Sequence, residues 1–322
     1  MRVIFWGTPD FATPALRALM GEGHDVVGVV TQPDRPRARG GRSRSSLDAS
    51  PVKQVAIEEA IPVLQPERPC GDDFVSQLRA LESDVSVVVA YGHILLKEVI
   101  DLPRLGTLNI HASLLPLYRG AAPIQAAIRD GRAETGVSIM RMVPALDAGP
   151  VLLALPTPIL PDETGGELQL RLAEIGAEGI IEALALLDLG GAVETPQDGG
   201  RATFARKVER ADAQVRWNAA ADTVERLIRA FDPKPGAWTT QAEMEVRLFG
   251  ARSVSAPPGS SGAPGTLLAA DGDAIIVACA GGAVRVQDVH CAGRKRQRAG
   301  EWLRGRGAVV GDVLGAKQPG MR

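Results

Sequence analysis

The segment 107–120 constrains the fold of this chain more than any other part of its sequence. It begins with four residues typical of a buried strand and continues into a loop of small residues and proline. Asn109 and His111, which are costly to bury, lie two positions apart, so the pleat of a strand places their side chains on one face. In open α/β sheets, ligands bind at the carboxyl ends of the strands. We therefore expect an α/β fold with a binding site where this strand ends.

Short apolar strands alternate with helices in the amino-terminal part. Residues 3–6 and 26–31 have the composition of buried strands, with an amphipathic helix between them, and the β-branched run at 85–90 predicts a central strand. This succession indicates a Rossmann-like, mostly parallel sheet with helices on both faces. The turn after the first strand has a single glycine, Gly7, in place of Gly-x-Gly-x-x-Gly. A dehydrogenase that uses a nicotinamide cofactor is therefore disfavoured.

The length and composition suit a two-domain globular protein. The chain has 322 residues, of which 45% are hydrophobic, and a formal net charge of −2, and we expect it to be cytoplasmic. Its three cysteines show no Cys-x-x-Cys spacing, so neither a disulfide framework nor a metal site is expected. The amino terminus lacks a signal-peptide core and no apolar run reaches membrane-spanning length, so we expect no membrane partner.

The composition changes after residue 189. Residues 190–214 are rich in glycine and polar residues, and we interpret them as an interdomain linker. Beyond it, short alternating runs separated by glycine turns occur at 245–248, 265–269, 274–279 and 283–289. They predict that residues 215–322 form a small β-barrel of the oligonucleotide-binding (OB) kind, after an α/β domain over 1–189.

The segment 32–50, which we name the basic loop, is the most positively charged part of the chain. Against two acidic residues it carries five arginines: Arg35, Arg37, Arg39, Arg42 and Arg44. A solvated surface loop is the simpler interpretation. Because the loop follows the second strand, its root lies at the carboxyl edge of the sheet, which favours an arm that binds the phosphates of a nucleic acid.

A second basic cluster lies near the carboxyl terminus, in the predicted barrel. Its members are Arg294, Lys295, Arg296 and Arg298. Such a cluster can be a solvated face, but beside the basic loop a second phosphate-binding patch is at least as well supported.

Three segments resemble the folate-dependent formyltransferases. Asn-x-His-x-Ser-Leu-Leu-Pro-x-x-Arg-Gly at 109–120 is similar to the signature of that family along its length. Ala-Tyr-Gly-x-Ile-Leu at 90–95 is similar to a second family segment, although the proline that usually follows is Leu96 here, and His93 stays without an assigned role. Met-x-x-x-x-Asp-x-Gly at 142–149 is similar to the segment with the catalytic aspartate. By itself Asp147 would be a turn residue. The resemblance implies that Asn109, His111 and Asp147 are catalytic.

The resemblance also implies that 10-formyltetrahydrofolate donates the formyl group. Its flat ring is expected to lie against two loops, whose contacting residues are Tyr91, Gly92, Ile94, Leu95, Ser113, Leu114, Leu115 and Pro116. Ser113 is not expected to be a nucleophile, because no Gly-x-Ser-x-Gly elbow surrounds it. Arg119 and Gly120 are expected to hold the shape of the loop.

One branch of this family has a basic insert after the second strand, a linker and a small barrel, and the resemblance to it covers essentially the full length. That branch formylates the α-amino group of initiator methionyl-tRNA, and we expect this chain to do so as a monomer. Asp147, directly or through His111, would deprotonate the amine, and Asn109 with an N–H of His111 would stabilise the oxyanion. His111 would then protonate the leaving nitrogen. The alternatives are a small-molecule formyltransferase, acting on glycinamide ribonucleotide or an amino sugar, and a non-catalytic RNA-binding protein.

Overall fold

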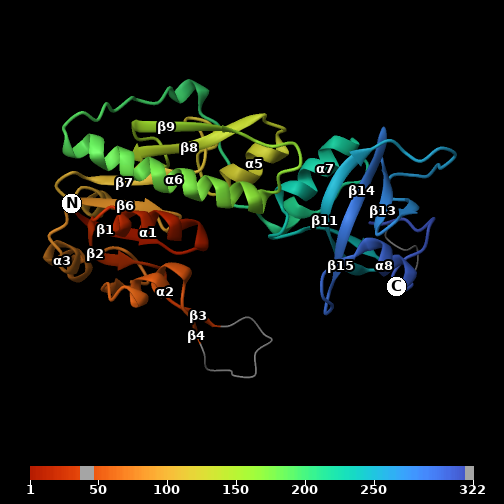
Figure 1. The fold of residues 1–322 in the computed structure, drawn as a ribbon, viewed down its shortest axis with the longest axis horizontal. Helices are drawn as coiled ribbons and strands as arrows, with labels where there is room; N and C mark the ends of the chain where they lie inside the picture. The colour runs from red at the N-terminus through yellow and green to blue at the C-terminus, as the bar shows by residue number, and fades with distance from the viewer. Residues whose placement is uncertain (37–46, 316–322) are drawn as a thin grey trace. The chain divides into compact units, whose positions relative to one another are not determined.

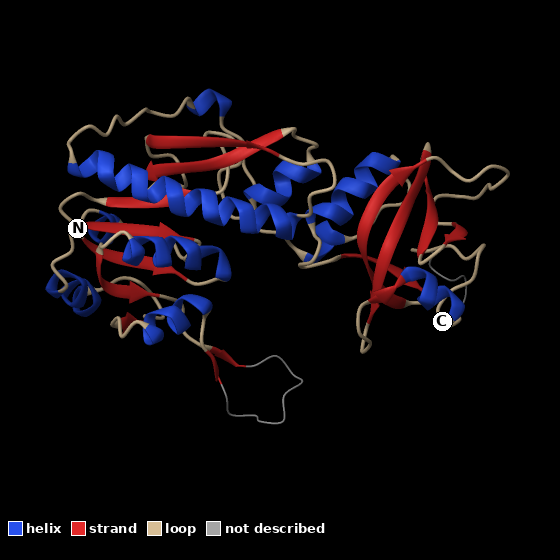
Figure 2. Cartoon of the chain, viewed as in Figure 1, coloured by secondary structure: helices blue, strands red, loops and turns tan. Residues whose placement is uncertain are grey.

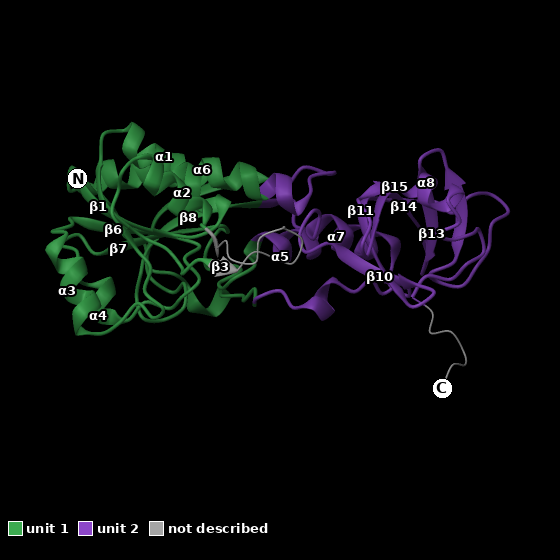
Figure 3. Cartoon of the chain, turned by 90° about the horizontal axis from the view of Figure 1, so that it is seen from below, with its two compact units in different colours: residues 1–123, 135–158, 169–206 green, residues 124–134, 159–168, 207–322 purple. Residues whose placement is uncertain are grey.

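A computed structural model describes residues 1–36 and 47–315 of the chain (Figures 1 and 2). The chain divides into two compact units, which Figure 3 colours separately. Unit 1 comprises Met1–Pro123, Thr135–Pro158 and Gln169–Arg206, and unit 2 comprises Ile124–Glu134, Ile159–Leu168 and Lys207–Arg322. The units interleave along the sequence, whereas the domains predicted from composition are contiguous.

Unit 1 is built on a seven-stranded sheet with the order β5-β2-β1-β6-β7-β8-β9. These strands are β1 (Arg2–Gly7), β2 (Asp25–Val30), β5 (Val63–Leu64), β6 (Val85–Val89), β7 (Thr107–His111), β8 (Glu134–Arg141) and β9 (Val151–Pro158). The five strands from β5 to β7 pair in parallel, and β8 pairs with β7 in the antiparallel direction. The predicted Rossmann-like, mostly parallel sheet is confirmed.

Helices pack on both faces of this sheet. They are α1 (Thr13–Gly21), α2 (Pro51–Glu58), α3 (Asp72–Ala80), α4 (Lys97–Ile100) and α6 (Gly165–Asp188). Helix α3 packs in one apolar cluster with Trp6 and Val88, whereas α6 approaches the other face, where a Cβ added to Gly176 would lie 2.7 Å from Ile110. Asn109 and His111 flank Ile110 in β7, so they lie on the face opposite α6.

Unit 2 contains an antiparallel sheet of six strands. Its order is β10-β11-β14-β13-β12, with β15 paired to β14. The strands are β10 (Ala237–Gln241), β11 (Met244–Val254), β12 (Leu267–Asp271), β13 (Ala274–Cys279), β14 (Gly282–Cys291) and β15 (Gln297–Arg298), and the helices are α5 (Pro123–Arg129), α7 (Ala221–Ala230) and α8 (Ala299–Arg304). Ile228, Phe231 and Trp302 pack with the sheet in one apolar core. The predicted β-rich carboxyl-terminal part is confirmed, while β10 and α8 were not predicted.

The remaining elements are short. They are the strand pair β3 (Arg35–Pro36) and β4 (Leu47–Asp48), which lies at the root of the basic loop, and the 3-10 helices Asp10–Ala12, Gly199–Arg201 and Arg210–Ala213. In the described part of the chain, no helix has the length and apolar character needed to cross a membrane.

Candidate active site

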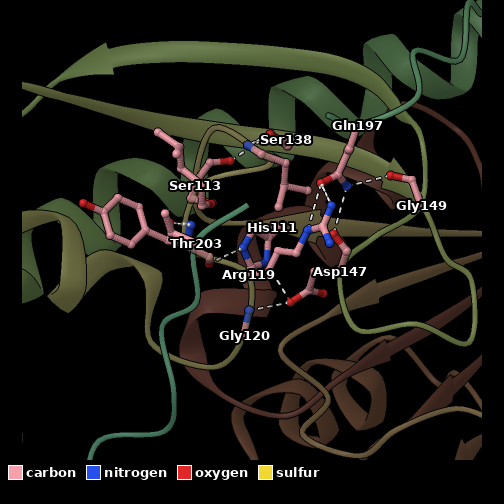
Figure 4. A network of polar contacts seen from close by, with 12 residues as sticks. His111, Ser113, Arg119, Gly120, Ser138, Asp147, Gly149, Gln197 and Thr203 are labelled. Atoms are coloured by element: carbon pink, nitrogen blue, oxygen red, sulfur yellow. Dashed lines mark hydrogen bonds and ion pairs between the residues drawn. The ribbon is translucent and has the colours of Figure 1, made fainter. Parts of the chain in front are cut away.

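His111 is the last residue of β7 and is 5% exposed. Its Nε2 lies 3.0 Å from the backbone oxygen of Tyr118, and its Nδ1 lies 3.7 Å from Oδ2 of Asp147 (Figure 4). Because a carbonyl oxygen only accepts hydrogen bonds, Nε2 carries a proton. The neutral ring therefore turns the lone pair of Nδ1 towards the Asp147 carboxylate.

Burial lowers the pKa of His111 below its ordinary value of 6.5. The negative charge of Asp147 and the hydrogen bond to the Tyr118 carbonyl act in the opposite direction, but burial is the largest effect. The ring is therefore neutral at pH 7. The His111 ring can take up a proton at Nδ1 when further negative charge near the ring raises its pKa.

Asp147 lies in the tight loop between β8 and β9. Its backbone φ of +45° is in the left-handed region, which costs a non-glycine residue about 1 to 2 kcal/mol. The backbone N–H of Gly120 donates to Oδ2 of Asp147 at 2.7 Å, and this carboxylate oxygen is the one that faces His111. A Cβ on Gly149 would lie 1.9 Å from the backbone oxygen of Arg141, so the loop packs closely on the end of β8. The structure thus brings Asp147 and His111 together, as the resemblance implies.

Asn109 lies on the same face of β7 as His111 and is 9% exposed. Its side-chain amide makes no hydrogen bond to any residue that the structure describes. Its amide atoms keep some access to solvent, because Asn109 is not among the residues whose fully buried polar atoms lack a partner. The Asn109 amide is therefore available to a bound molecule at the end of the strand.

The loop after His111 is held by hydroxyl groups. Ser113 donates its hydroxyl to the backbone oxygen of Leu117 at 2.6 Å. Ser138, on β8, donates its hydroxyl to the backbone oxygen of Ser113 at 2.8 Å and accepts from the backbone N–H of Leu115 at 3.0 Å. The hydroxyl of Ser113 is thus used within the loop, and contact between Ser113 and the folate stays a prediction.

The second predicted folate-contacting segment, residues 91–95, follows β6 and contains both buried and exposed residues. Tyr91 and Leu95 are each 2% exposed and pack in the apolar core with Trp6, whose ring centroid is 5.3 Å from that of Tyr91. Burial raises the pKa of Tyr91 to about 12. Ile94 is 76% exposed and Gly92 is exposed as well. Tyr91 and Leu95 can therefore offer a ligand only their backbone, and Ile94 can offer its side chain.

The segment 194–206 holds residues of the site that sequence reasoning missed. The hydroxyl of Thr203 accepts from the backbone N–H of Tyr118 at 2.8 Å, and the backbone oxygen of Thr203 accepts from the N–H of Arg119 at 2.8 Å. Gln197 hydrogen-bonds Arg119 on one side and the Asp147 loop on the other (Figure 4). The polar, glycine-rich composition of this segment predicted a linker, and no local signal marked either residue.

Comparison with known proteins agrees with the geometry. Residues 1–184 match the formyl transferase family and residues 207–307 match the formyl transferase C-terminal domain. The chain is 45% identical over 305 residues to a methionyl-tRNA formyltransferase of Marinobacter nauticus, covering 95% of this chain and 96% of the relative. It is 46% identical over 317 residues to that of Thiobacillus denitrificans, covering 98% and 100%. The chain belongs to the methionyl-tRNA formyltransferase family.

Solved structures share the fold. The methionyl-tRNA formyltransferase from Clostridium thermocellum superposes with a TM-score of 0.58 at 14% identity, covering 90% of this chain and 98% of that one. HypX from Aquifex aeolicus, solved in complex with tetrahydrofolic acid, gives a TM-score of 0.65 at 21% identity over 99% of this chain, which spans about half of HypX (51%). Members of the formyltransferase family use folate-derived formyl donors.

The predicted tRNA-contacting residues of this formyltransferase differ in their surroundings. The backbone of Arg35 lies in β3, while Arg37, Arg39, Arg42 and Arg44 fall outside the described residues. Arg294 and Lys295 are exposed. Arg296 forms ion pairs with Asp232 at 3.2 Å and Asp288 at 2.9 Å, and Arg298 pairs with Asp288 at 3.1 Å. Within the second cluster, only Arg294 and Lys295 are therefore without an acidic partner among the described residues.

Across residues 1–36 and 47–315, no three His, Cys, Asp or Glu side chains lie close enough to hold a metal ion. His111 and Asp147 form a pair without a third ligand of this kind in the described chain. The arrangement is suited to moving a proton.

Proposed function

We propose that this chain transfers the formyl group of 10-formyltetrahydrofolate to the α-amino group of methionine esterified to the initiator tRNA. The observation that carries the proposal is the placement of three groups at the end of β7: the unengaged Asn109 amide, the buried His111 ring and the Asp147 carboxylate 3.7 Å from it. A donor, a proton carrier and a base together are what an acyl transfer to an amine requires.

The first step is the release of a proton from the amine. An α-amino group has a pKa of roughly 7.7 to 8.0, so at neutral pH most of it is protonated and cannot attack. Asp147 is the proposed base, acting directly or through His111. The lone pair of Nδ1 faces the Asp147 carboxylate at 3.7 Å, so a proton on either group can pass to the other once they approach to hydrogen-bond distance.

The second step is attack of the amine nitrogen on the formyl carbon, which creates a tetrahedral oxyanion. The Asn109 amide is the proposed donor to this oxygen, and a good donor in such a site contributes about 3 to 4 kcal/mol. Nε2 of His111 donates to Tyr118, so an N–H of His111 that reaches the oxyanion has to be that of protonated Nδ1.

The third step breaks the bond between the formyl carbon and the folate nitrogen. The leaving nitrogen needs a proton, and His111, protonated at Nδ1 by the first step, is the proposed source. The attacking nitrogen still carries two protons after the attack, and it loses one of them to the Asp147–His111 pair as the amide forms. This second proton passes from the pair to water, so the reaction of the ammonium form releases one proton and the pair returns to its starting state.

The substrates are proposed to lie on the surfaces that surround this site. The folate ring is placed against the backbone of the loops 91–95 and 113–116, which Ser138 and Trp6 hold in shape. The initiator tRNA is assigned to the basic loop and to Arg294 and Lys295. The proposed organisation of the chain is a catalytic domain over 1–189, a linker over 190–214 and a tRNA-binding domain over 215–322. Because charged tRNA is a cytoplasmic substrate, we place the enzyme in the cytoplasm.

An assay with the purified chain tests the proposal. The chain is incubated with 10-formyltetrahydrofolate and methionyl initiator tRNA, and formyl-methionine is measured after hydrolysis of the ester. Parallel reactions contain glycinamide ribonucleotide or a nucleotide-linked amino sugar as the amine. Formylation of the tRNA-bound methionine with the small amines unmodified is the expected result. Formylation of a small amine with the tRNA unmodified would replace the proposal by its small-molecule alternative.

A further inference from the structure

Gln197 connects the loop that carries Asp147 with the loop that follows His111. Its Nε2 donates to the backbone oxygens of Asp147 and Gly149 at 2.8 and 2.7 Å. Its Oε1 accepts from Nε and Nη2 of Arg119 at 3.1 and 2.8 Å (Figure 4). Carbonyl oxygens only accept and a guanidinium only donates, so the amide has one possible orientation. Both of its donors and its acceptor oxygen are engaged.

Arg119 lies between two residues that each contact one member of the pair. The backbone oxygen of Tyr118 accepts from His111, and the backbone N–H of Gly120 donates to Asp147. A series of bonded residues therefore leads from His111 through Tyr118 and Arg119 to Gln197, and from Gln197 to Asp147. The 3.7 Å distance between Nδ1 of His111 and Oδ2 of Asp147 completes this series to a ring. A shift of Gln197 changes this distance unless another contact compensates.

The Asp147 loop depends on contacts from outside itself. A non-glycine residue in the left-handed region persists only where its surroundings determine the conformation, and Asp147 has a φ of +45°. The two hydrogen bonds from Gln197 reach the carbonyls on both sides of Ala148. They fix the orientation of the peptide groups that follow Asp147, and hence the direction of its side chain.

We propose that Gln197 is a positioning residue for formyl transfer, which sets the distance and orientation of Asp147 relative to His111. Gln197 reaches Asp147 through backbone carbonyls, and it makes no hydrogen bond to the ring of His111 or to the carboxylate of Asp147. The inference rests on the proposed function for its kinetic readout, while a second readout needs no substrate.

Gln197→Glu is the most specific substitution, because it replaces the amide NH2 group by an oxygen and leaves the side-chain volume nearly unchanged. The carboxylate keeps the acceptor that faces Arg119, but it turns an oxygen towards the carbonyls of Asp147 and Gly149, which repel it. We expect kcat to fall about 10- to 100-fold, as for a misplacement of about 1 Å, with little change in KM for the folate or in tRNA affinity. Gln197→Ala removes the same bonds without repulsion and serves if the Glu variant does not fold.

The matched control is Gln241→Glu in unit 2. Gln241 is also partly buried and donates its Nε2 to Asp312 at 2.7 Å, so the substitution likewise replaces a donor by a carboxylate. Thermal unfolding of all three variants measures the loss of stability. We expect the control variant to keep the wild-type kcat. If Gln241→Glu loses as much kcat as Gln197→Glu, the loss is due to lower stability and the proposal is overturned.

The second readout is the titration of the His111 ring by NMR in the absence of substrates. Asp147 raises the pKa of His111 through its charge, so a carboxylate that moves away lets this pKa fall. The proposal requires a lower kcat in both folded Gln197 variants and a lower His111 pKa in Gln197→Ala, which adds no charge of its own, and the absence of either change overturns it. If the wild-type chain formylates no tRNA, the proposed function is refuted. The titration of His111 would still test whether Gln197 positions Asp147.

Discussion

The backbone oxygen of Tyr118 accepts a hydrogen bond from Nε2 of His111 at 3.0 Å, seven residues before it in the chain. This contact fixes the proton on Nε2 and leaves Nδ1 to face Asp147. The choice of tautomer is therefore made by the turn that follows β7, before any substrate is present. Its consequences can be measured.

The first prediction concerns the pKa of His111. Burial holds it below 6.5, and the charge of Asp147 raises it, so Asp147→Asn should lower it further. The folded-state pKa is depressed, so the stabilisation from His111 is present above the unfolded-state pKa of about 6.5 and is lost as pH falls through the folded value. Imidazole NMR and unfolding measured at several pH values test both statements. A higher His111 pKa in Asp147→Asn would contradict the assignment of the pair.

The second prediction concerns the three proposed catalytic residues. Asn109→Ala, His111→Ala and Asp147→Ala should each lower kcat roughly 100-fold or more, because each group acts on the transition state. Affinity for tRNA should stay close to that of the wild type. Single-turnover formylation and tRNA binding are measured in parallel, and a near-normal kcat in any one variant removes the role assigned to that residue.

The third prediction concerns metals. The proposed steps use only a carboxylate, an imidazole and an amide, so exhaustive chelation should leave activity intact once the magnesium that folds the tRNA is restored. Activity of the stripped enzyme is measured with and without added zinc. A requirement for zinc would show that the proposed steps are incomplete.

The fourth prediction concerns the basic loop. Changing Arg39, Arg42 and Arg44 together to alanine should weaken tRNA binding, because each arginine bound to a phosphate releases counterions. The slope of log K against log salt should become shallower by about 0.7 to 0.9 for each phosphate that the loop no longer binds, with folate binding unchanged. An unaltered slope would exclude these arginines from the tRNA-binding surface.

The fifth prediction separates the members of the second basic cluster. Arg296 is paired with Asp232 and Asp288, and its guanidinium carbon lies 4.2 Å from the centroid of the Phe249 ring. Arg296→Ala should therefore lower the free energy of unfolding by about 1 to 2 kcal/mol. The double variant Arg294→Ala/Lys295→Ala should keep its stability and bind tRNA more weakly. Denaturant unfolding and tRNA titration test the contrast, and the reverse pattern would assign phosphate binding to Arg296.

Local patterns in the sequence were sufficient to predict the sheet and the strand end with the site. Asn109 and His111 share a face because side chains alternate along any strand, and the apolar runs of β1, β2 and β6 require burial on both faces. Helix α2 begins at Pro51, a favoured first residue of a helix, and Ser50 caps it by accepting from the N–H of Lys53 at 3.2 Å. Each of these features depends on neighbours a few residues away.

The support of the site could not be predicted in the same way. Gln197 and Thr203 reach Asp147 and Tyr118 across 50 and 85 residues, through single hydrogen bonds that leave no periodicity in the sequence. The resemblance implied the role of Asp147, but the spacing between Asp147 and His111 did not imply contact. The pairing of Arg296 with Asp232 spans 64 residues and likewise had no local sign.

The place of β1 in the sheet affects how the protein can fold during synthesis. β1 lies between β2 and β6, and Val3 pairs with both Val26 and Val85. At roughly 5 to 20 residues per second, the ribosome delivers β6 about 4 to 16 seconds after β1. During that interval one edge of a largely apolar strand has no neighbour, and a nascent chain is open there to pairing with another copy. Chaperone dependence of this enzyme should therefore be sought early in translation, before β6 has emerged.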